Sequence, residues 1–225
     1  MASTAGYTTV GQILSQWTAI VGRNMGVCLL AGGFIAILGT VLDLAMGEGG
    51  SSLLLSIATF FISYHFSEHI LQQEGLMARG VSSRHYASAF GAAFLGTLGI
   101  VAGLIVLVLP GLYVAARWSM SSSLVIAEGL TTTQALGQSW QRTAQAAWQV
   151  TGAAFVVGLG MLALFALVGL VGGLSETGTS EQMGLVGTAV ANAAGAGIQI
   201  MTTLFAVAVY ACLGQSTGNL DDVFG

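Results

Sequence analysis

Residues 65–69, with the sequence His-Phe-Ser-Glu-His, form the pattern in this chain that most directly suggests catalysis. The order matches the H-x-x-E-H arrangement, in which two histidines bind zinc from one helix face and the glutamate activates a water. A catalytic zinc needs a third protein ligand, and no downstream motif supplies one. We therefore expect His65, Glu68 and His69 to mark the hydrated end of a membrane helix, with an intramembrane metalloenzyme as an alternative.

Arg117 is the second candidate, because it falls inside an apolar segment beside Trp118. An arginine at the centre of a membrane helix costs roughly 2.5–3.5 kcal/mol, so such side chains usually face the protein interior and pair. Asp43 and Glu128 are the candidate partners, and Asn192 could line the same region. The sequence predicts either a polar pocket or lipid-headgroup site, or a structural arginine that snorkels or forms one buried ion pair.

Other polar residues in the apolar segments suggest packing rather than chemistry. Asn192 and Gln199 lie seven residues apart, hence on one helix face, where interhelical hydrogen bonds are their usual role. Cys28 and Cys212 are expected to be small buried side chains. The sequence has no glycine-rich phosphate loop, Cys-x-x-Cys pair or serine-nucleophile motif, so we expect no cofactor.

The elements that carry these residues are expected to be membrane helices. Hydrophobic residues make up 55% of the 225 positions and charged residues 6%, against roughly 25% charged in a soluble domain. So few charged residues could not cover the surface of a soluble domain of this length. The net charge of −4 comes without a basic patch, which argues against nucleic-acid binding. The composition predicts one all-α, polytopic membrane domain over residues 1–225.

Apolar segments of about 20 residues predict six membrane helices. Their approximate ranges are 26–46, 53–71, 86–109, 112–127, 148–174 and 184–213. Pro110-Gly111 is expected to form a hairpin hinge between the third and fourth, because proline lacks an amide hydrogen and disfavours helix before it. The alternative is five spans, with Pro110 as a kink inside one long helix.

Two amphipathic helices are predicted outside the spans. Residues 7–24 carry apolar side chains at helical spacing, and Trp17 suits the headgroup region, so we expect this helix to lie on the membrane surface. Residues 128–147 predict a second one on the cytoplasmic side, after the cap at Thr131. Because the first apolar run begins only near Met25, we expect no cleavable signal peptide.

The charges predict how the six spans are oriented. One side of the membrane receives Arg23, Arg79, Arg84 and Arg142, and the opposite loops carry Glu48, Glu176 and Glu181. By the positive-inside rule, both termini are then cytoplasmic.

Small residues at four-residue spacing predict close contacts between helices. They occur at Gly99/Gly103, Gly169/Gly173 and Gly187/Ala191/Gly195. Such faces could also support a homo-oligomer.

An ordered series of residues in the second quarter and middle of the chain carries a family resemblance. The series is Pro110-Gly111-Leu112-Tyr113, Arg117-Trp118, Glu128-Gly129, Ala135-Leu136, Ser139-Trp140 and Thr143. It resembles a superfamily of bacterial six-span membrane proteins that includes the YciC-type inner-membrane proteins and the membrane domain attached to some glycerophosphodiester phosphodiesterases. The resemblance covers about residues 72–150. It implies a helical bundle in the bacterial inner membrane and no catalytic residues, since the phosphodiesterase activity of the fused relatives lies in a separate soluble domain.

These features favour a non-enzymatic integral membrane protein. We expect a scaffold or accessory component that sits in the lipid bilayer and binds lipid or a membrane-protein partner. The first alternative is a small transporter or channel with a polar path near Arg117, Asp43 and Asn192.

Overall fold

The computed structural model describes residues 8–78, 85–106, 108–174 and 180–214. Within these ranges the chain forms eight helices and no strand, which confirms the all-α prediction. In chain order the helices are α1 (Val10–Arg23), α2 (Met25–Gln73), α3 (Tyr86–Val106), α4 (Val108–Trp118), α5 (Ser121–Glu128), α6 (Thr132–Arg142), α7 (Ala147–Leu174) and α8 (Ser180–Leu213).

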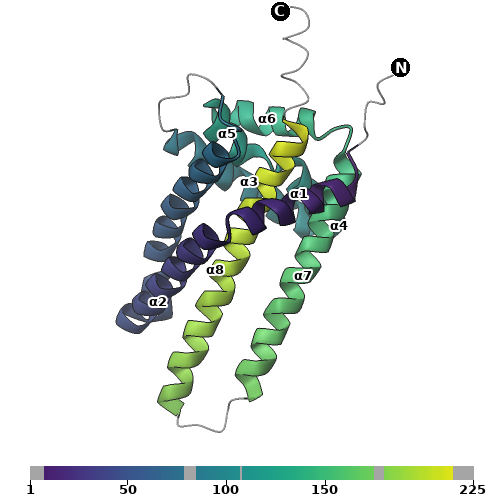
Figure 1. Ribbon diagram of the computed structural model, residues 1–225. Helices are drawn as coiled ribbons and strands as arrows, with labels where there is room; N and C mark the ends of the chain where they lie inside the picture. Colours follow the sequence, from purple (N-terminus) through teal and green to yellow (C-terminus); the bar gives the residue numbers. More distant parts are fainter. Residues whose placement is uncertain (1–7, 79–84, 107, 175–179, 215–225) are drawn as a thin grey trace, which may run out of the picture.

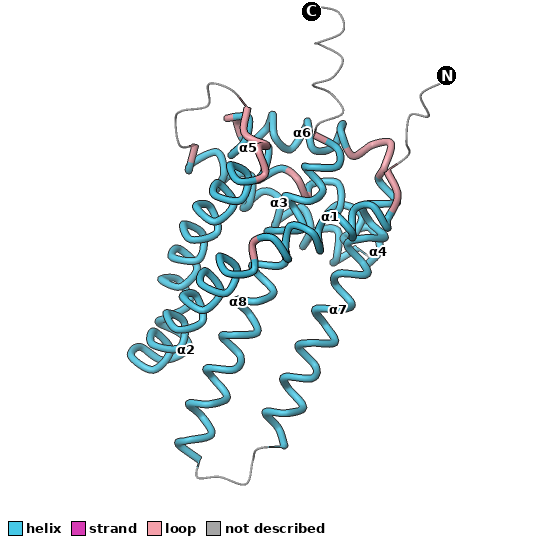
Figure 2. Tube along the Cα trace, in the orientation of Figure 1, coloured by secondary structure: helices cyan, strands magenta, loops and turns pink. Residues whose placement is uncertain are grey.

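The helices are arranged as a head with long legs. Figure 1 shows α1, α5 and α6 gathered at one end, from which α2, α7 and α8 extend. Most of the described turns lie in the same end (Figure 2). We call α1, α5, α6 and the adjoining helix ends the head, and the helices that extend from them the legs.

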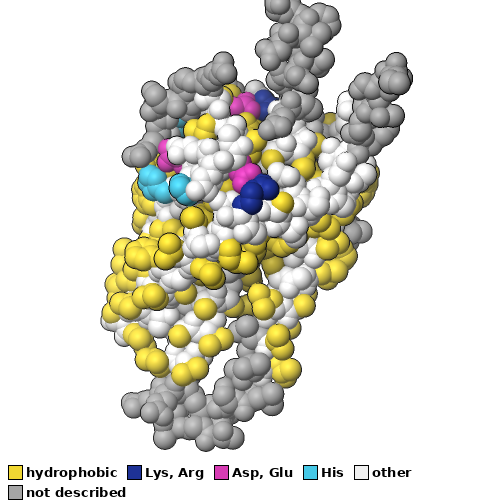
Figure 3. Space-filling view, in the orientation of Figure 1, with side chains coloured by type: hydrophobic (Ala, Val, Ile, Leu, Met, Phe, Trp, Pro, Cys, Tyr) yellow, Lys and Arg dark blue, Asp and Glu magenta, His cyan; other side chains and the backbone are white. Residues whose placement is uncertain are grey.

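The legs expose many large apolar side chains, whose contact with water would be unfavourable. Leu30, Leu53 and Ile105 are 75–79% exposed, and the space-filling view shows the legs covered with hydrophobic atoms (Figure 3). Apolar patches of this extent mark contact with a membrane or another protein. Four segments are long and apolar enough to cross a membrane: Met25–Met46, Tyr86–Gly103, Ala147–Leu167 and Gly184–Leu213.

Apart from Asp43 on α2, the described charges gather in the head instead. Figure 3 shows arginine, acidic and histidine side chains at that end of the molecule. Of the residues that orient the predicted bundle, Arg79, Arg84 and Glu176 lie outside the described ranges, as do the side chains of Glu48 and Glu181. The orientation of the bundle in the membrane therefore stays a prediction.

The helix α2 folds back on itself. A straight helix of its 49 residues would be about 73 Å long. Yet the side-chain amide of Asn24, before its first residue, donates a hydrogen bond of 3.2 Å to the carboxylate of Glu74, after its last. The reversal lies between Asp43 and Ser51, whose side chains are hydrogen-bonded although a straight helix would place them about 12 Å apart. This interval includes the gap between the predicted spans 26–46 and 53–71. The second arm contains the predicted span 53–71, but it is more polar than the first and is not among the four apolar segments.

The helices α3 and α4 pack side by side in opposite directions. A Cβ atom on Gly103 would stand 2.8 Å from the Cα of Gly111, and one on Gly99 would overlap the ring of Trp118. A straight helix would separate residues 103 and 111 by about 12 Å, so the chain reverses between them. Pro110 is the third residue of α4, in the first turn, where its missing amide hydrogen costs no helical bond.

The predicted span 112–127 is not one helix. It is divided between α4 and α5, with a break between Trp118 and Ser121. The hydroxyl groups of Ser119 and Ser121 each donate a 2.8 Å hydrogen bond to the backbone carbonyl three residues before, which competes with helical bonding. With 11 residues, α4 is about 16 Å long and cannot cross a bilayer alone.

The second predicted amphipathic helix is confirmed as α6, although it is shorter than the range 128–147. Thr131 is its N-cap, and the side-chain oxygen of Gln134 accepts a 3.1 Å hydrogen bond from the amide of Thr131. Glu128 belongs instead to α5, which ends at Gly129 with a φ of 68°.

The apolar face of α1 packs on protein, contrary to the expectation of a helix lying on the lipid surface. Ile13 and Ile20 are fully buried, in contacts that α1 makes mainly with α8 and α7. The indole of Trp17 donates a 3.2 Å hydrogen bond to the carbonyl of Met201 in α8. An amphipathic pattern requires an apolar neighbour but does not distinguish a lipid surface from a helix bundle.

The small-residue pairs have different outcomes. Gly99 and Gly103 are in close contact with α4, as predicted. Gly187 and Gly195 have nothing within 4 Å of the position of a Cβ, so the predicted packing face of the 187/191/195 ladder is not used within the chain. Gly169 is equally open. The surroundings of Gly173 lie outside the part of the chain that the structure describes.

Candidate functional site

The side chain of Arg117 is buried near the end of α4, where α4, α6 and α7 meet. The residue is 4% exposed, and two of its guanidinium nitrogens, Nε and Nη1, are buried without a hydrogen-bond partner. No acidic side chain among the described residues forms a salt bridge with it. A buried charge normally needs a pair and several hydrogen bonds, so this guanidinium lacks its usual compensation.

Aromatic rings provide the contacts that the guanidinium does have. Its central carbon lies 4.3 Å from the centroid of the Trp140 ring and 5.9 Å from that of Tyr113. Tyr113 also contacts Trp148, and Trp118 contacts Trp140. Cation–π contacts of this kind contribute up to about 2 kcal/mol when desolvated, which offsets only part of the cost of burying the charge.

The backbone of Arg117 is held in place by α6. Its carbonyl accepts hydrogen bonds from the hydroxyl groups of Ser139, at 2.7 Å, and Thr143, at 3.3 Å. Both residues are buried, and neither hydroxyl accepts a hydrogen bond from Nε or Nη1 of the guanidinium. The α4–α6 contact is therefore rigid around a side chain that is not itself satisfied.

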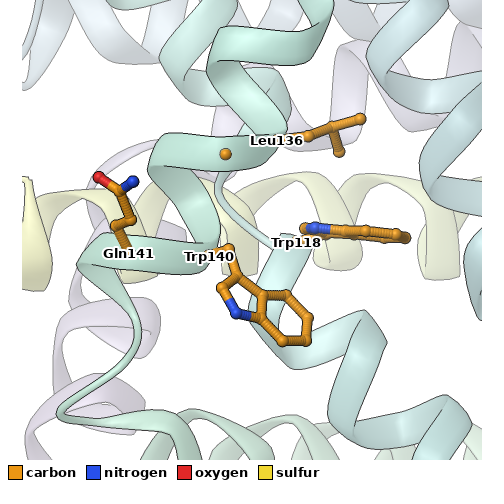
Figure 4. A pocket seen from close by; sticks show the side chains of 5 residues that line it. Trp118, Leu136, Trp140 and Gln141 are labelled. Atoms are coloured by element: carbon orange, nitrogen blue, oxygen red, sulfur yellow. The ribbon is translucent and has the colours of Figure 1, made fainter.

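Trp140 also lines a shallow depression. It has a volume of about 420 Å³, and Figure 4 shows the rings of Trp118 and Trp140 beside it. Leu136, Gly137 and Gln141 complete its lining. Trp140 thus contacts both the buried guanidinium and the depression, and it is 39% exposed.

Asp43, the first predicted partner of Arg117, is engaged elsewhere. One carboxylate oxygen accepts a 2.5 Å hydrogen bond from the hydroxyl of Ser51, and the other accepts a 2.8 Å hydrogen bond from the amide of Asn192. Asp43 and Asn192 therefore form a contact between α2 and α8 that does not include Arg117. Gln199 similarly donates a 3.1 Å hydrogen bond to Ser63, so both α8 amides bind α2 as expected for interhelical contacts.

Glu128, the second predicted partner, belongs to a different ion pair. Its two oxygens accept hydrogen bonds from Arg142 at 2.5 and 2.8 Å, and the Tyr210 hydroxyl donates to it at 3.0 Å. Arg142 also donates to the side chain of Gln138. This network joins α5, α6 and α8. The sequence analysis missed it, because Tyr210 lies 82 residues from Glu128 and no periodic pattern connects them.

A second ion pair closes the α2 hairpin at the head. Arg23 donates hydrogen bonds of 2.6 and 3.2 Å to the two oxygens of Glu74. The hydrogen bond to Glu74 raises the pKa of Arg23, although desolvation opposes the shift. A raised pKa means that this contribution to stability is present at neutral pH and is lost only as the pH rises through that pKa.

The residues of the H-x-x-E-H pattern lie on the second arm of α2, near the head. The Nδ1 atom of His65 is 3.3 Å from Glu68, and its Nε2 atom is 3.1 Å from the hydroxyl of Tyr86. His69 is exposed. Among the described residues, no three His, Cys, Asp or Glu side chains are grouped so that they could share a metal ion.

The two cysteines are not joined in a disulfide. Cys28 is buried and Cys212 half-buried, each with a free thiol, in line with their expected role as small apolar side chains.

Comparisons with protein families, with curated proteins and with solved structures found no match to this chain.

Proposed function

We propose that this chain is an integral membrane protein without catalytic activity, a scaffold or accessory component whose head binds lipid. The single observation that carries the proposal is the buried, unpaired Arg117 beside an aromatic-lined depression. A catalytic role would need reacting side chains grouped in a cleft, whereas the carboxylates of Glu74 and Glu128 are each engaged in an ion pair that joins helices.

The site's position favours lipid over a soluble ligand. It lies where the apolar legs meet the polar head, which corresponds to the boundary between hydrocarbon and water. Trp140 and Trp148 are exposed there, at 39% and 76%. Tryptophan is enriched at the headgroup level, where lipid phosphates are found.

The topology that we propose has six crossings. Four are the long apolar segments, and the other two are the second arm of α2 and the helix α4, which α5 continues into the head. This arrangement agrees with the resemblance to the bacterial six-span superfamily noted from residues 110–143. It would place the head and both termini in the cytoplasm of a bacterium, with the legs in the inner membrane.

A reporter fusion tests this topology. A reporter fused after Gln138, in α6, is expected to report a cytoplasmic location. The head carries Arg23 and Arg142, and positively charged segments of membrane proteins remain on the cytoplasmic side. A fusion after Glu48, at the far end of the α2 hairpin, is the matched comparison and is expected to report the periplasm. A periplasmic signal from the Gln138 fusion would contradict the six-span arrangement.

Lipid retention tests the proposed function. The protein purified in a mild detergent is expected to keep lipid through delipidating washes that strip bulk lipid, as seen by native mass spectrometry. A matched membrane protein with no buried unpaired arginine provides the control. If no lipid stays bound to the wild-type protein under conditions in which it remains folded, the lipid-binding function is wrong.

A further inference from the structure

The unpaired guanidinium of Arg117 raises a question of charge balance. Its Nε and Nη1 atoms have no partner, and its neighbours on α4 and α6 are aromatic rings and hydroxyl groups already bonded to its own carbonyl. Glu128 does not compensate it, because both of its oxygens accept from Arg142. Among the described residues no carboxylate pairs with this charge, so the partner that the guanidinium lacks is an anion.

The chemistry of the side chain points to phosphate. Guanidinium is planar and offers five donors in a fixed geometry that matches the oxygens of phosphate. The cation–π contact with Trp140, at 4.3 Å from the ring centroid, uses none of the guanidinium hydrogen-bond donors. Because Ser139 and Thr143 fix the backbone of Arg117, the site is built before any ligand arrives.

The depression and the guanidinium have one described residue in common. Trp140 is the only one of its lining residues that also contacts the guanidinium in a described cation–π contact. At Gly137 nothing lies within 4 Å of the position of a Cβ, so the floor of the depression is open there. Leu136 and the tryptophan rings make the rest of the lining largely apolar, which suits the glycerol and first methylene groups of a lipid.

We propose that Arg117 binds the phosphate group of an anionic lipid that enters through the depression, with Trp140 as the movable cover. The inference rests on the proposed lipid-binding function and specifies its ligand and residue. A rotation of the partly exposed Trp140 ring connects the depression with the guanidinium. The phosphate then replaces the missing hydrogen-bond partners of Nε and Nη1, and the acyl chains follow the apolar legs.

Two variants test the site without depending on each other. Arg117→Gln removes the charge, and Gly137→Leu fills the depression while leaving Arg117 intact. Gly137→Leu is expected to fold, because the added side chain meets open space on an exposed part of α6. Gly160→Leu places the same side chain at an equally open position on α7, away from the depression, and serves as the control.

The measurement is lipid binding to protein in nanodiscs and by native mass spectrometry, with phosphatidylglycerol compared with phosphatidylcholine. Charged hydrogen bonds are strong, so both site variants are expected to lose the preference for phosphatidylglycerol by at least about tenfold, while Gly160→Leu keeps it. Inorganic phosphate is the second arm. A rise in melting temperature with phosphate that disappears in Arg117→Gln would identify free phosphate as the source of the same chemistry.

The outcomes separate this inference from the broader proposal. If wild type and both site variants retain anionic lipid equally, and phosphate has no effect that depends on Arg117, then Arg117 is not the site although lipid binding stands. If the wild type retains lipid without preferring an anionic headgroup, the phosphate site is likewise excluded. If the wild type retains no lipid and shows no response to phosphate, both proposals fail.

Discussion

Replacing Glu128 with glutamine is expected to lower the free energy of unfolding by about 2–3 kcal/mol. The substitution keeps the shape of the side chain but removes the charge that Arg142 and Tyr210 share. Breaking a fully buried ion pair typically costs about 3–5 kcal/mol. The cost is lower here because the two charged side chains keep 20% and 18% of their surface exposed. Reversible unfolding in mixed detergent micelles measures the difference.

The same substitution at the other ion pair of the head is the control. Glu74→Gln also leaves an arginine without its carboxylate, but the Arg23 side chain is 52% exposed and water can solvate it. We expect a clearly smaller loss. Tyr210→Phe removes only the 3.0 Å hydroxyl contact and should cost about 1 kcal/mol. If Glu128→Gln and Glu74→Gln are equally mild, the Glu128 network does not hold α5, α6 and α8 together.

The two arginines of the α4–α6 region, Arg117 and Arg142, differ in burial and in hydrogen bonding. Arg142 forms two hydrogen bonds to Glu128 and one to Gln138, so its burial stabilises the head. Arg117 is more deeply buried and has no such bonds in the described part of the chain. A structural role explains Arg142, because removing its side chain would break the hydrogen-bond network with Glu128 and Gln138. The buried Arg117 is a cost to folding unless a ligand compensates it, which is why we assign it the binding role.

The long helices were predictable from the sequence because their signal is local. A run of apolar residues long enough to cross a bilayer needs no tertiary information, and the predicted ranges 26–46 and 148–174 overlap the apolar segments Met25–Met46 and Ala147–Leu167. The cap at Thr131 was local as well. The break between α4 and α5 was not predicted, because it depends on the hydroxyls of Ser119 and Ser121 turning to the backbone.

The candidate site was only half predictable. An arginine within an apolar segment is conspicuous in the sequence, and Arg117 was identified for that reason. Its surroundings were not, because the rings of Tyr113 and Trp140 reach it only after α4 and α6 have packed together. The expected partner Glu128 is bound by Arg142 instead. Pairing between charges depends on three-dimensional distance, which composition and spacing do not contain.

Replacing Ile20 with alanine is expected to destabilise the protein by about 2–5 kcal/mol, because it leaves a cavity in the contact of α1 with the bundle. Ile20 is completely buried within the protein, with an exposed fraction of 0%. Two contacts fix the helix around it, from Trp17 to the carbonyl of Met201 and from Val10 to Gly152. The surrounding side chains cannot collapse into the space without moving α1. Unfolding in mixed micelles measures the loss.

Ile37→Ala is the matched comparison, because it deletes the same atoms from a residue of α2 that is 67% exposed. Lipid or detergent fills the vacated volume there, so the expected change is under about 1 kcal/mol. The pair of variants distinguishes the two environments that an amphipathic sequence leaves open. A small effect at both positions would mean that α1 rests on lipid, as its pattern alone suggests. A large effect at Ile20 alone would mean that α1 is a structural part of the head, held against α7 and α8.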